Sequence, residues 1–188
     1  MTTAGLTVAP STPRTVPLAL LIWLVAALAV GATGVFARLA FPAPQLIIVA
    51  LVAAAIVAAT VIRPVRAWVD ALSWRTLVGF HGVRLIGAVF LWLGARGVLA
   101  PMFARRAGWG DIAAALIALA FVAFAVAPTR AKLAFNAWNL FGLLDLTVAV
   151  STATWVTQQG LVPGVEPLFG LPLLAASHVV LFRRINAR

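Results

Sequence analysis

Four side chains in otherwise apolar segments are the residues best suited to chemistry: His81, Arg84, Asp145 and His178. His81 and Arg84 are three residues apart, so a helix places them on one face. Arg84 supplies a fixed positive charge, Asp145 supplies a carboxylate, and imidazoles exchange protons near neutral pH. A charged side chain at the centre of a membrane helix costs about 2.5–3.5 kcal/mol on insertion scales, so each needs a partner inside the protein. The pattern predicts an intramembrane pocket that binds a proton or a small ligand such as an anion, for transport or sensing.

The two histidines are expected at the same depth, in the cytoplasmic half of the membrane. At a rise of about 1.5 Å per residue, His81 and His178 lie roughly 6–8 Å inside the ends of their segments. Two imidazoles at one level could hold haem b from opposite sides, with Gly79 and Gly82 leaving room for the macrocycle. A haem protein that carries electrons is therefore one alternative. Histidines that bond only backbone carbonyls or lipid headgroups are another. Zinc and non-haem iron are disfavoured, because two nitrogen ligands and few carboxylates are present.

The simplest alternative for Arg84 and Asp145 is a buried ion pair that fixes the register of two helices. Such pairs often add little net stability, whereas the loss of one partner is costly. In that case the chain is a structural membrane subunit with no ligand, in contact with a partner subunit or a second copy of itself. No catalytic residue is predicted, since Ser151, Thr152 and Thr154 would need a base and neither histidine lies at their depth.

Asp111 and Asn139 are secondary polar candidates. Asp111 follows a Gly-Trp-Gly sequence and is predicted to open a helix as its N-cap, where a carboxylate bonds first-turn amides. The functional alternative for Asp111 is a polar gate on the outer side, formed with Arg96 or Arg105. Asn139 is predicted on the same helix as Asp145 but is expected to point away from the face that Asp145 occupies.

The composition of the chain excludes several classes of protein. Its 188 residues are 64% hydrophobic and 10% charged, whereas soluble domains carry about 25% charged residues. Cysteine is absent, which excludes disulfides, iron–sulfur clusters, thiolate zinc sites and thiol catalysis. The formal net charge of +10 comes from basic residues that lie between apolar segments without forming a run, so nucleic acid is not the expected partner. The expected partner is the lipid bilayer.

The apolar segments predict an all-α protein, a bundle of six transmembrane helices with a short amphipathic helix in the interface. The six spans are predicted at about residues 17–37, 44–62, 77–95, 111–127, 133–156 and 168–182. Residues 65–76 repeat apolar side chains at helical spacing and include two Trp, which is typical of an interfacial helix. The junction 97–110 is interrupted by Gly and Pro and is expected to lie in the interface or to dip shallowly into the membrane.

The spans form one predicted domain, residues 17–184, between two cytoplasmic tails. Residues 1–16 are expected to be a disordered tail, and residues 185–188 a shorter one. An alternative for the first span is a secretory signal cleaved after Val30 and Ala32.

The basic residues predict the orientation of this domain. Nine lie on the side of the N-terminus, namely Arg14, Arg63, Arg66, Arg75, Arg130, Lys132, Arg183, Arg184 and Arg188, and four on the other, namely Arg38, Arg96, Arg105 and Arg106. By the positive-inside rule both termini are cytoplasmic, although the three Arg of the third loop argue locally for the opposite.

Two stretches of sequence carry a resemblance to a known group. Residues 107–111 (AGWGD) and 138–146 (WNLFGLLDL) resemble those of uncharacterised bacterial multi-pass membrane proteins with six helices. The similarity extends over about residues 77–182 and includes Phe80-His81 with Arg84. It implies the bacterial inner (cytoplasmic) membrane and transfers no catalytic residue.

Overall fold

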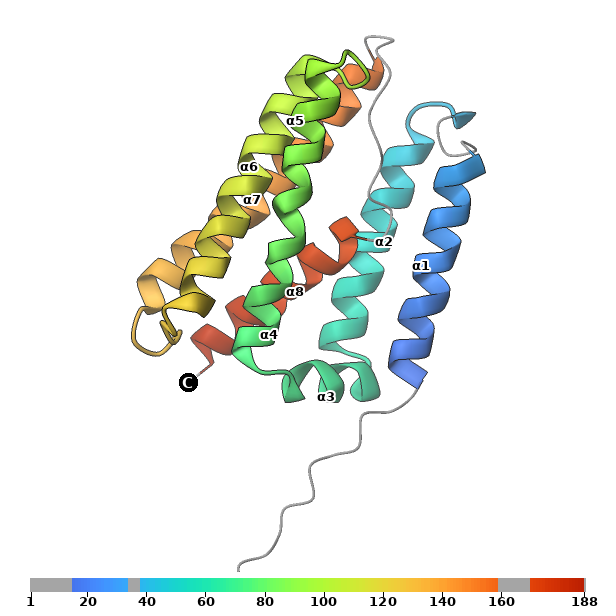
Figure 1. The fold of residues 1–188 in the computed structure, drawn as a ribbon. Helices are drawn as coiled ribbons and strands as arrows, with labels where there is room; N and C mark the ends of the chain where they lie inside the picture. The colour runs from blue at the N-terminus through green and yellow to red at the C-terminus, as the bar shows by residue number, and fades with distance from the viewer. Residues whose placement is uncertain (1–14, 34–37, 159–169, 188) are drawn as a thin grey trace, which may run out of the picture.

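The computed structural model describes residues 15–33, 38–158 and 170–187, and within these ranges the chain is helical and without strands (Figure 1). The bounds of the elements are α1 Thr15–Thr33, α2 Ala43–Thr60, α3 Arg63–Ala71, α4 Trp74–Gly79, η2 Phe80–Ile86, α5 Gly87–Ala95, α6 Pro101–Ala123, α7 Lys132–Gln158 and α8 Gly170–Asn186. Since α4, η2 and α5 run on without a break, the described residues form seven helices rather than six.

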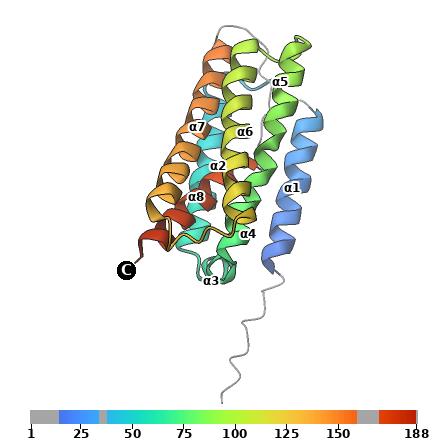
Figure 2. The ribbon, with the colours of Figure 1, turned by 60° about the vertical axis from the view of Figure 1, so that its left-hand side comes forward.

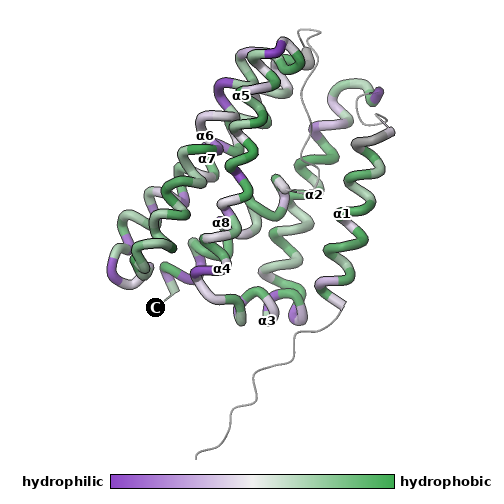
Figure 3. The backbone as a smooth tube through the Cα atoms, in the orientation of Figure 1, coloured by the Kyte–Doolittle hydropathy of each residue, from purple (hydrophilic) through white to green (hydrophobic). Residues whose placement is uncertain are grey.

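Four of the helices are long and apolar enough to cross a membrane. They cover Ala43–Thr60, Trp74–Ala95, Pro101–Ala123 and Lys132–Val156. The apolar part of α1, Thr15–Val30, is shorter. Four of the six predicted spans are therefore supported by length and composition. In Figure 3, α1 and α2 are hydrophobic over most of their length, and hydrophilic stretches occur at α3 and also at the opposite end of the molecule, near α5.

The helix predicted over residues 65–76 is present but begins and ends earlier than expected. Instead of one helix over 65–76, α3 stops at Ala71, and Ser73 begins the next helix as an N-cap that accepts a 3.0 Å hydrogen bond from the Thr76 amide. The helix α3 lies across the end of α2 (Figure 1). Its Asp70 pairs with Arg66 on the same helix and with Arg183 near the end of α8. These ion pairs tie the C-terminal helix to the α3 corner.

The continuous helix Trp74–Ala95 contains a 3₁₀ segment, η2, that the sequence did not predict. In a 3₁₀ helix every third side chain lies on one line along the axis. Burial follows this period of three, and the buried line consists of Val78, His81, Arg84, Gly87 and Phe90. The 3₁₀ geometry thus aligns the two polar side chains on the face that packs against α6 and α8.

The largest correction concerns α6, which begins at Pro101 instead of residue 111 and ends at Ala123 instead of 127. Two glycines of the junction, Gly108 and Gly110, are helix contacts inside α6, whereas Gly97, with φ +70°, lies in the turn before it. A Cβ at Gly87 would lie 2.4 Å from the Gly108 oxygen, so the backbones of α5 and α6 touch where no side chain would fit. The next pair of helices, α6 and α7, also lies side by side along its length (Figure 2).

Candidate functional site

Arg84 is the centre of a buried group of charges. Its side chain is fully enclosed, and its Nε donates a 2.7 Å hydrogen bond to Oδ1 of Asp111 on α6. Its Nη2 donates to Oδ2 of Asp145 on α7. The remaining nitrogen, Nη1, lies 3.4 Å from the carbonyl oxygen of Gly142. One guanidinium therefore joins three helices and is shared by two carboxylates.

Two glycines on α6 and α7 make room for this group. A Cβ at Gly110 would lie 1.6 Å from Oδ1 of Asp145. At Gly142, a Cβ would lie 2.3 Å from the His178 ring and 3.2 Å from Nη1 of Arg84. Both charges and the imidazole lie directly against helix backbone, where any other residue would displace them. Neither glycine was predicted from the sequence to be part of the site.

His178 on α8 has its protonation pattern set by Asn139. The Asn139 amide nitrogen donates to the His178 carbonyl oxygen at 3.0 Å, which leaves its oxygen 2.7 Å from Nδ1 of the ring. Because an amide oxygen only accepts, Nδ1 of His178 carries the hydrogen. Nε2 is then the bare nitrogen, and it faces Nη1 of Arg84 at 3.5 Å. A ring that accepts at Nε2 is neutral.

His81 has the opposite tautomer. Ser177 donates its hydroxyl hydrogen to the Leu174 carbonyl oxygen at 2.8 Å, so its oxygen accepts the 3.0 Å bond from Nε2 of His81. Nδ1 of His81 is therefore the bare nitrogen. It is buried and has no hydrogen-bond partner among the described residues.

The two imidazoles are too close together for the haem alternative. Their ring centroids are 4.2 Å apart, with the planes tilted by 48°, and Trp138 lies 4.9 and 5.5 Å from them. Two rings at this distance are in van der Waals contact, so a porphyrin does not fit between them. Nε2 of His178 also faces a guanidinium rather than an open space. The arrangement therefore does not fit haem b.

The structure brings the four predicted site residues into one cluster and adds both secondary candidates to it. Asp111 was expected as an N-cap or as a gate with Arg96 or Arg105; both expectations are wrong, because α6 starts ten residues earlier and Asp111 bonds Arg84 in mid-helix. Asn139 was expected to point away from the site but bonds His178.

The position of Asn139 has a simple geometric reason. Asn139 and Asp145 are about 120° apart around the axis of α7, so the two side chains do not share a stripe. Gly142 lies between them, and His178 and Arg84 enter over its bare backbone. The site therefore uses a wider face of α7 than a single stripe. A glycine between two polar residues at spacings of three was the signal in the sequence.

A family model described as "Domain of unknown function (DUF8737)" matches residues 41–186, which include α2 to α8 and all residues of the cluster. Comparison with the curated proteins gives no match, and neither does comparison with the solved structures.

Proposed function

We propose, for a chain that belongs to the DUF8737 family of unknown function, that it is a polytopic membrane protein whose buried Arg84–Asp111–Asp145 cluster binds a proton, for proton-coupled transport or sensing. The observation that carries the proposal is the sharing of one guanidinium by two buried carboxylates. With both carboxylates ionised, the three groups have a net charge of −1. Uptake of one proton makes the cluster neutral, which burial favours.

An anionic ligand is the weaker form of this proposal. Arg84 already donates to Asp111 and Asp145, so an anion would have to displace a carboxylate. The histidines offer no positive charge either, because each ring accepts a hydrogen bond or has a bare nitrogen. The proton is the ligand that the hydrogen-bond pattern favours, and the neutral histidines hold the guanidinium and the neighbouring backbone in place.

In this proposal α1 and α8 complete six spans in a bacterial inner membrane, and both termini are cytoplasmic. The support is the unequal distribution of cations. One end of the molecule in Figure 1 is formed by α3, the start of α4, the α6–α7 connection and the end of α8, and these segments contain seven described cations, namely Arg63, Arg66, Arg75, Arg130, Lys132, Arg183 and Arg184. The opposite end is formed by the α1–α2 and α5–α6 connections and the start of α6, which contain four, namely Arg38, Arg96, Arg105 and Arg106. By the positive-inside rule the α3 end faces the cytoplasm.

The test is infrared spectroscopy on protein labelled with ¹³C in its aspartate carboxyl groups. The chain has three aspartates, Asp70, Asp111 and Asp145, so in an Asp70→Asn background the label reports only the cluster. We expect an isotope-shifted band of a protonated carboxyl group that titrates with pH in membranes. Asp111→Asn or Asp145→Asn in the same background should remove it, and Asp70→Asn alone should not. Labelled carboxylates that stay ionised at every pH at which the protein is folded would show that the cluster binds no proton.

The second candidate function is purely structural, and the observation in its favour is that Arg84 bonds join η2 to both α6 and α7. A second measurement distinguishes the structural function from proton-coupled transport. It is the uptake of protons by vesicles that contain the protein and an internal pH dye. Proton-coupled transport predicts a flux that Asp111→Asn reduces. A structural cluster predicts none.

A further inference from the structure

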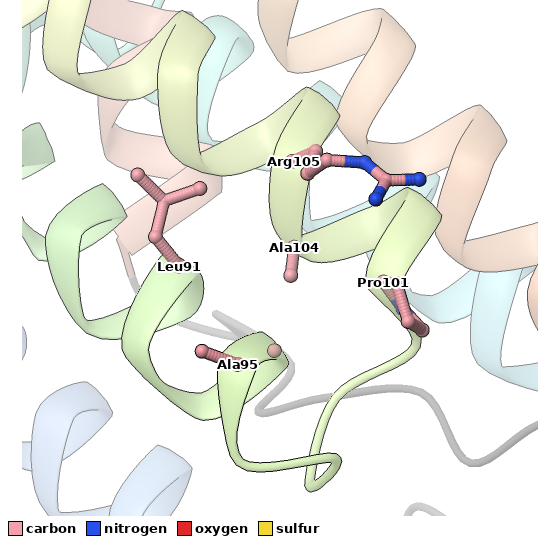
Figure 4. Close-up of a pocket in the computed structure, with 6 residues that line it drawn as sticks. Leu91, Ala95, Pro101, Ala104 and Arg105 are labelled. Atoms are coloured by element: carbon pink, nitrogen blue, oxygen red, sulfur yellow. The ribbon is translucent and has the colours of Figure 1, made fainter.

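A hollow of about 240 Å³ lies between the end of α5 and the beginning of α6 (Figure 4), and none of its lining residues belongs to the charge cluster. It is lined by Leu91, Gly94, Ala95, Pro101, Ala104 and Arg105. Five of these residues are apolar or lack a side chain, and one is a cation. The hollow is smaller than the about 300–1,000 Å³ of pockets that enclose a whole small molecule. It can therefore hold only part of a ligand.

The hollow exists because small residues bring the two helices together without filling the surface beside them. A Cβ at Gly94 would lie 2.4 Å from the Cβ of Ala104. Ala95 is exposed at the rim, and in Figure 4 it lies with Leu91 on the α5 side, opposite Ala104 and Pro101. The lining offers methyl and methylene groups and can contact an aliphatic chain closely.

Arg105 gives this apolar hollow a charged edge. Its side chain is exposed and has no hydrogen bond or ion pair among the described residues. It extends away from Ala95 along the flank of α6 (Figure 4). Arg105 is four residues from the start of α6, about 6 Å along the axis. In the proposed bilayer this depth lets its guanidinium reach the headgroups, as long basic side chains do near helix ends.

We propose that this hollow seats one acyl chain of an anionic phospholipid, whose phosphate pairs with Arg105. The ligand must combine an aliphatic chain with a negative head, because the lining is apolar and the edge is an exposed cation. At this end of the molecule the neighbouring Arg96, which stacks on Trp92 at 4.6 Å, adds positive charge, and the described residues there include no carboxylate. The inference shares the bilayer with the proposed function but does not depend on proton binding.

The experiment measures phospholipid retention by native mass spectrometry of protein extracted from nanodiscs of phosphatidylcholine with phosphatidylglycerol. Wild-type protein should retain one phosphatidylglycerol in preference to phosphatidylcholine. Arg105→Gln should lower this retention about fivefold, the effect of about 1 kcal/mol per basic residue. Ala95→Phe, which fills the hollow and leaves the charge unchanged, should lower it as well.

Arg106→Gln is the matched control, because Arg106 is the next residue on α6, is also exposed and does not line the hollow. It should retain phosphatidylglycerol like the wild type. Equal losses in Arg105→Gln and Arg106→Gln would mean that any nearby charge attracts the lipid, which would overturn the proposal. Unchanged retention in a folded Ala95→Phe variant would overturn it too. Inorganic phosphate at equal concentration should not compete, since the acyl chain supplies the fit.

Discussion

The contact between α5 and α6 has two parts, which share close packing of small residues but differ in what surrounds them. At one part Gly87 packs on the Gly108 backbone, and at the other Gly94 packs on Ala104. Beside the first, α7 and α8 contribute Asp145 and His178, which fill the space around Arg84. Beside the second, a hollow remains, and its lining comes from α5, α6 and no third helix. Small residues determine how closely two helices approach; a third helix determines whether the site is closed.

The largest effect is expected for Arg84→Leu. It leaves Asp111 and Asp145 buried without their shared cation, and the loss of one partner from a buried charge group costs about 3–5 kcal/mol of unfolding free energy. Denaturant titration in detergent or bicelles measures this loss.

The triple variant Arg84→Leu/Asp111→Leu/Asp145→Leu should recover most of that stability, because it leaves no buried charge. The double variant Arg84→Leu/Asp145→Leu should not, since Asp111 stays unpaired. Full recovery in the double variant would mean that Asp111 is not a member of the cluster.

A smaller loss is expected for Gly142→Ala. The new Cβ would lie 2.3 Å from the ring of His178, and overpacking of a tight site costs about 1–3 kcal/mol. Thermal unfolding measures the loss. Gly170→Ala is the control, because a Cβ there meets nothing within 4 Å, and equal loss in both variants would argue against close packing at Gly142.

The histidine tautomers can be read directly, because the chain contains two histidines. Solid-state NMR of ¹⁵N-histidine should show one ring protonated at Nδ1, which disappears in His178→Gln, and one protonated at Nε2. Ser177→Ala removes the acceptor of His81 and should cost about 1–3 kcal/mol, because a buried donor is left unpaired. Two identical tautomers in the wild type would contradict the hydrogen-bond pattern.

The smallest effect on stability is expected at the hollow. Arg105→Gln and Arg106→Gln change exposed side chains, and such changes stay within about 0.5 kcal/mol. Denaturant titration without added lipid measures both. A loss as large as that of Gly142→Ala would place Arg105 in a structural role.

The sequence predicted the helical class and most helix positions, because long apolar segments with polar ends leave few choices. The bounds of α2 and α7 differ from the predicted 44–62 and 133–156 by one or two residues at each end. The start of α6 was missed because Gly108 and Gly110 were taken as breaks, whereas their neighbours across the helix contact require glycine. A single sequence does not distinguish these two uses of glycine.

The candidate site was predictable by residue type and depth but not by contact. Charged residues at similar depths in a membrane need partners inside the protein. This requirement alone predicted that Arg84 and Asp145 lie close together. Asp111 was assigned to the end of a helix, so its depth was wrong by about ten residues. The roles of all these residues in function stay predictions until protonation is measured.

The 3₁₀ segment also increases the length of the helix that contains it. Each residue of a 3₁₀ helix rises about 2.0 Å rather than about 1.5 Å, so the seven residues of η2 add about 3.5 Å to the length of Trp74–Ala95. These 22 residues extend as far as an α-helix with about two more. In the proposed bilayer, the backbone geometry that aligns His81 with Arg84 therefore also matches this helix to a thicker hydrocarbon layer than its residue number suggests.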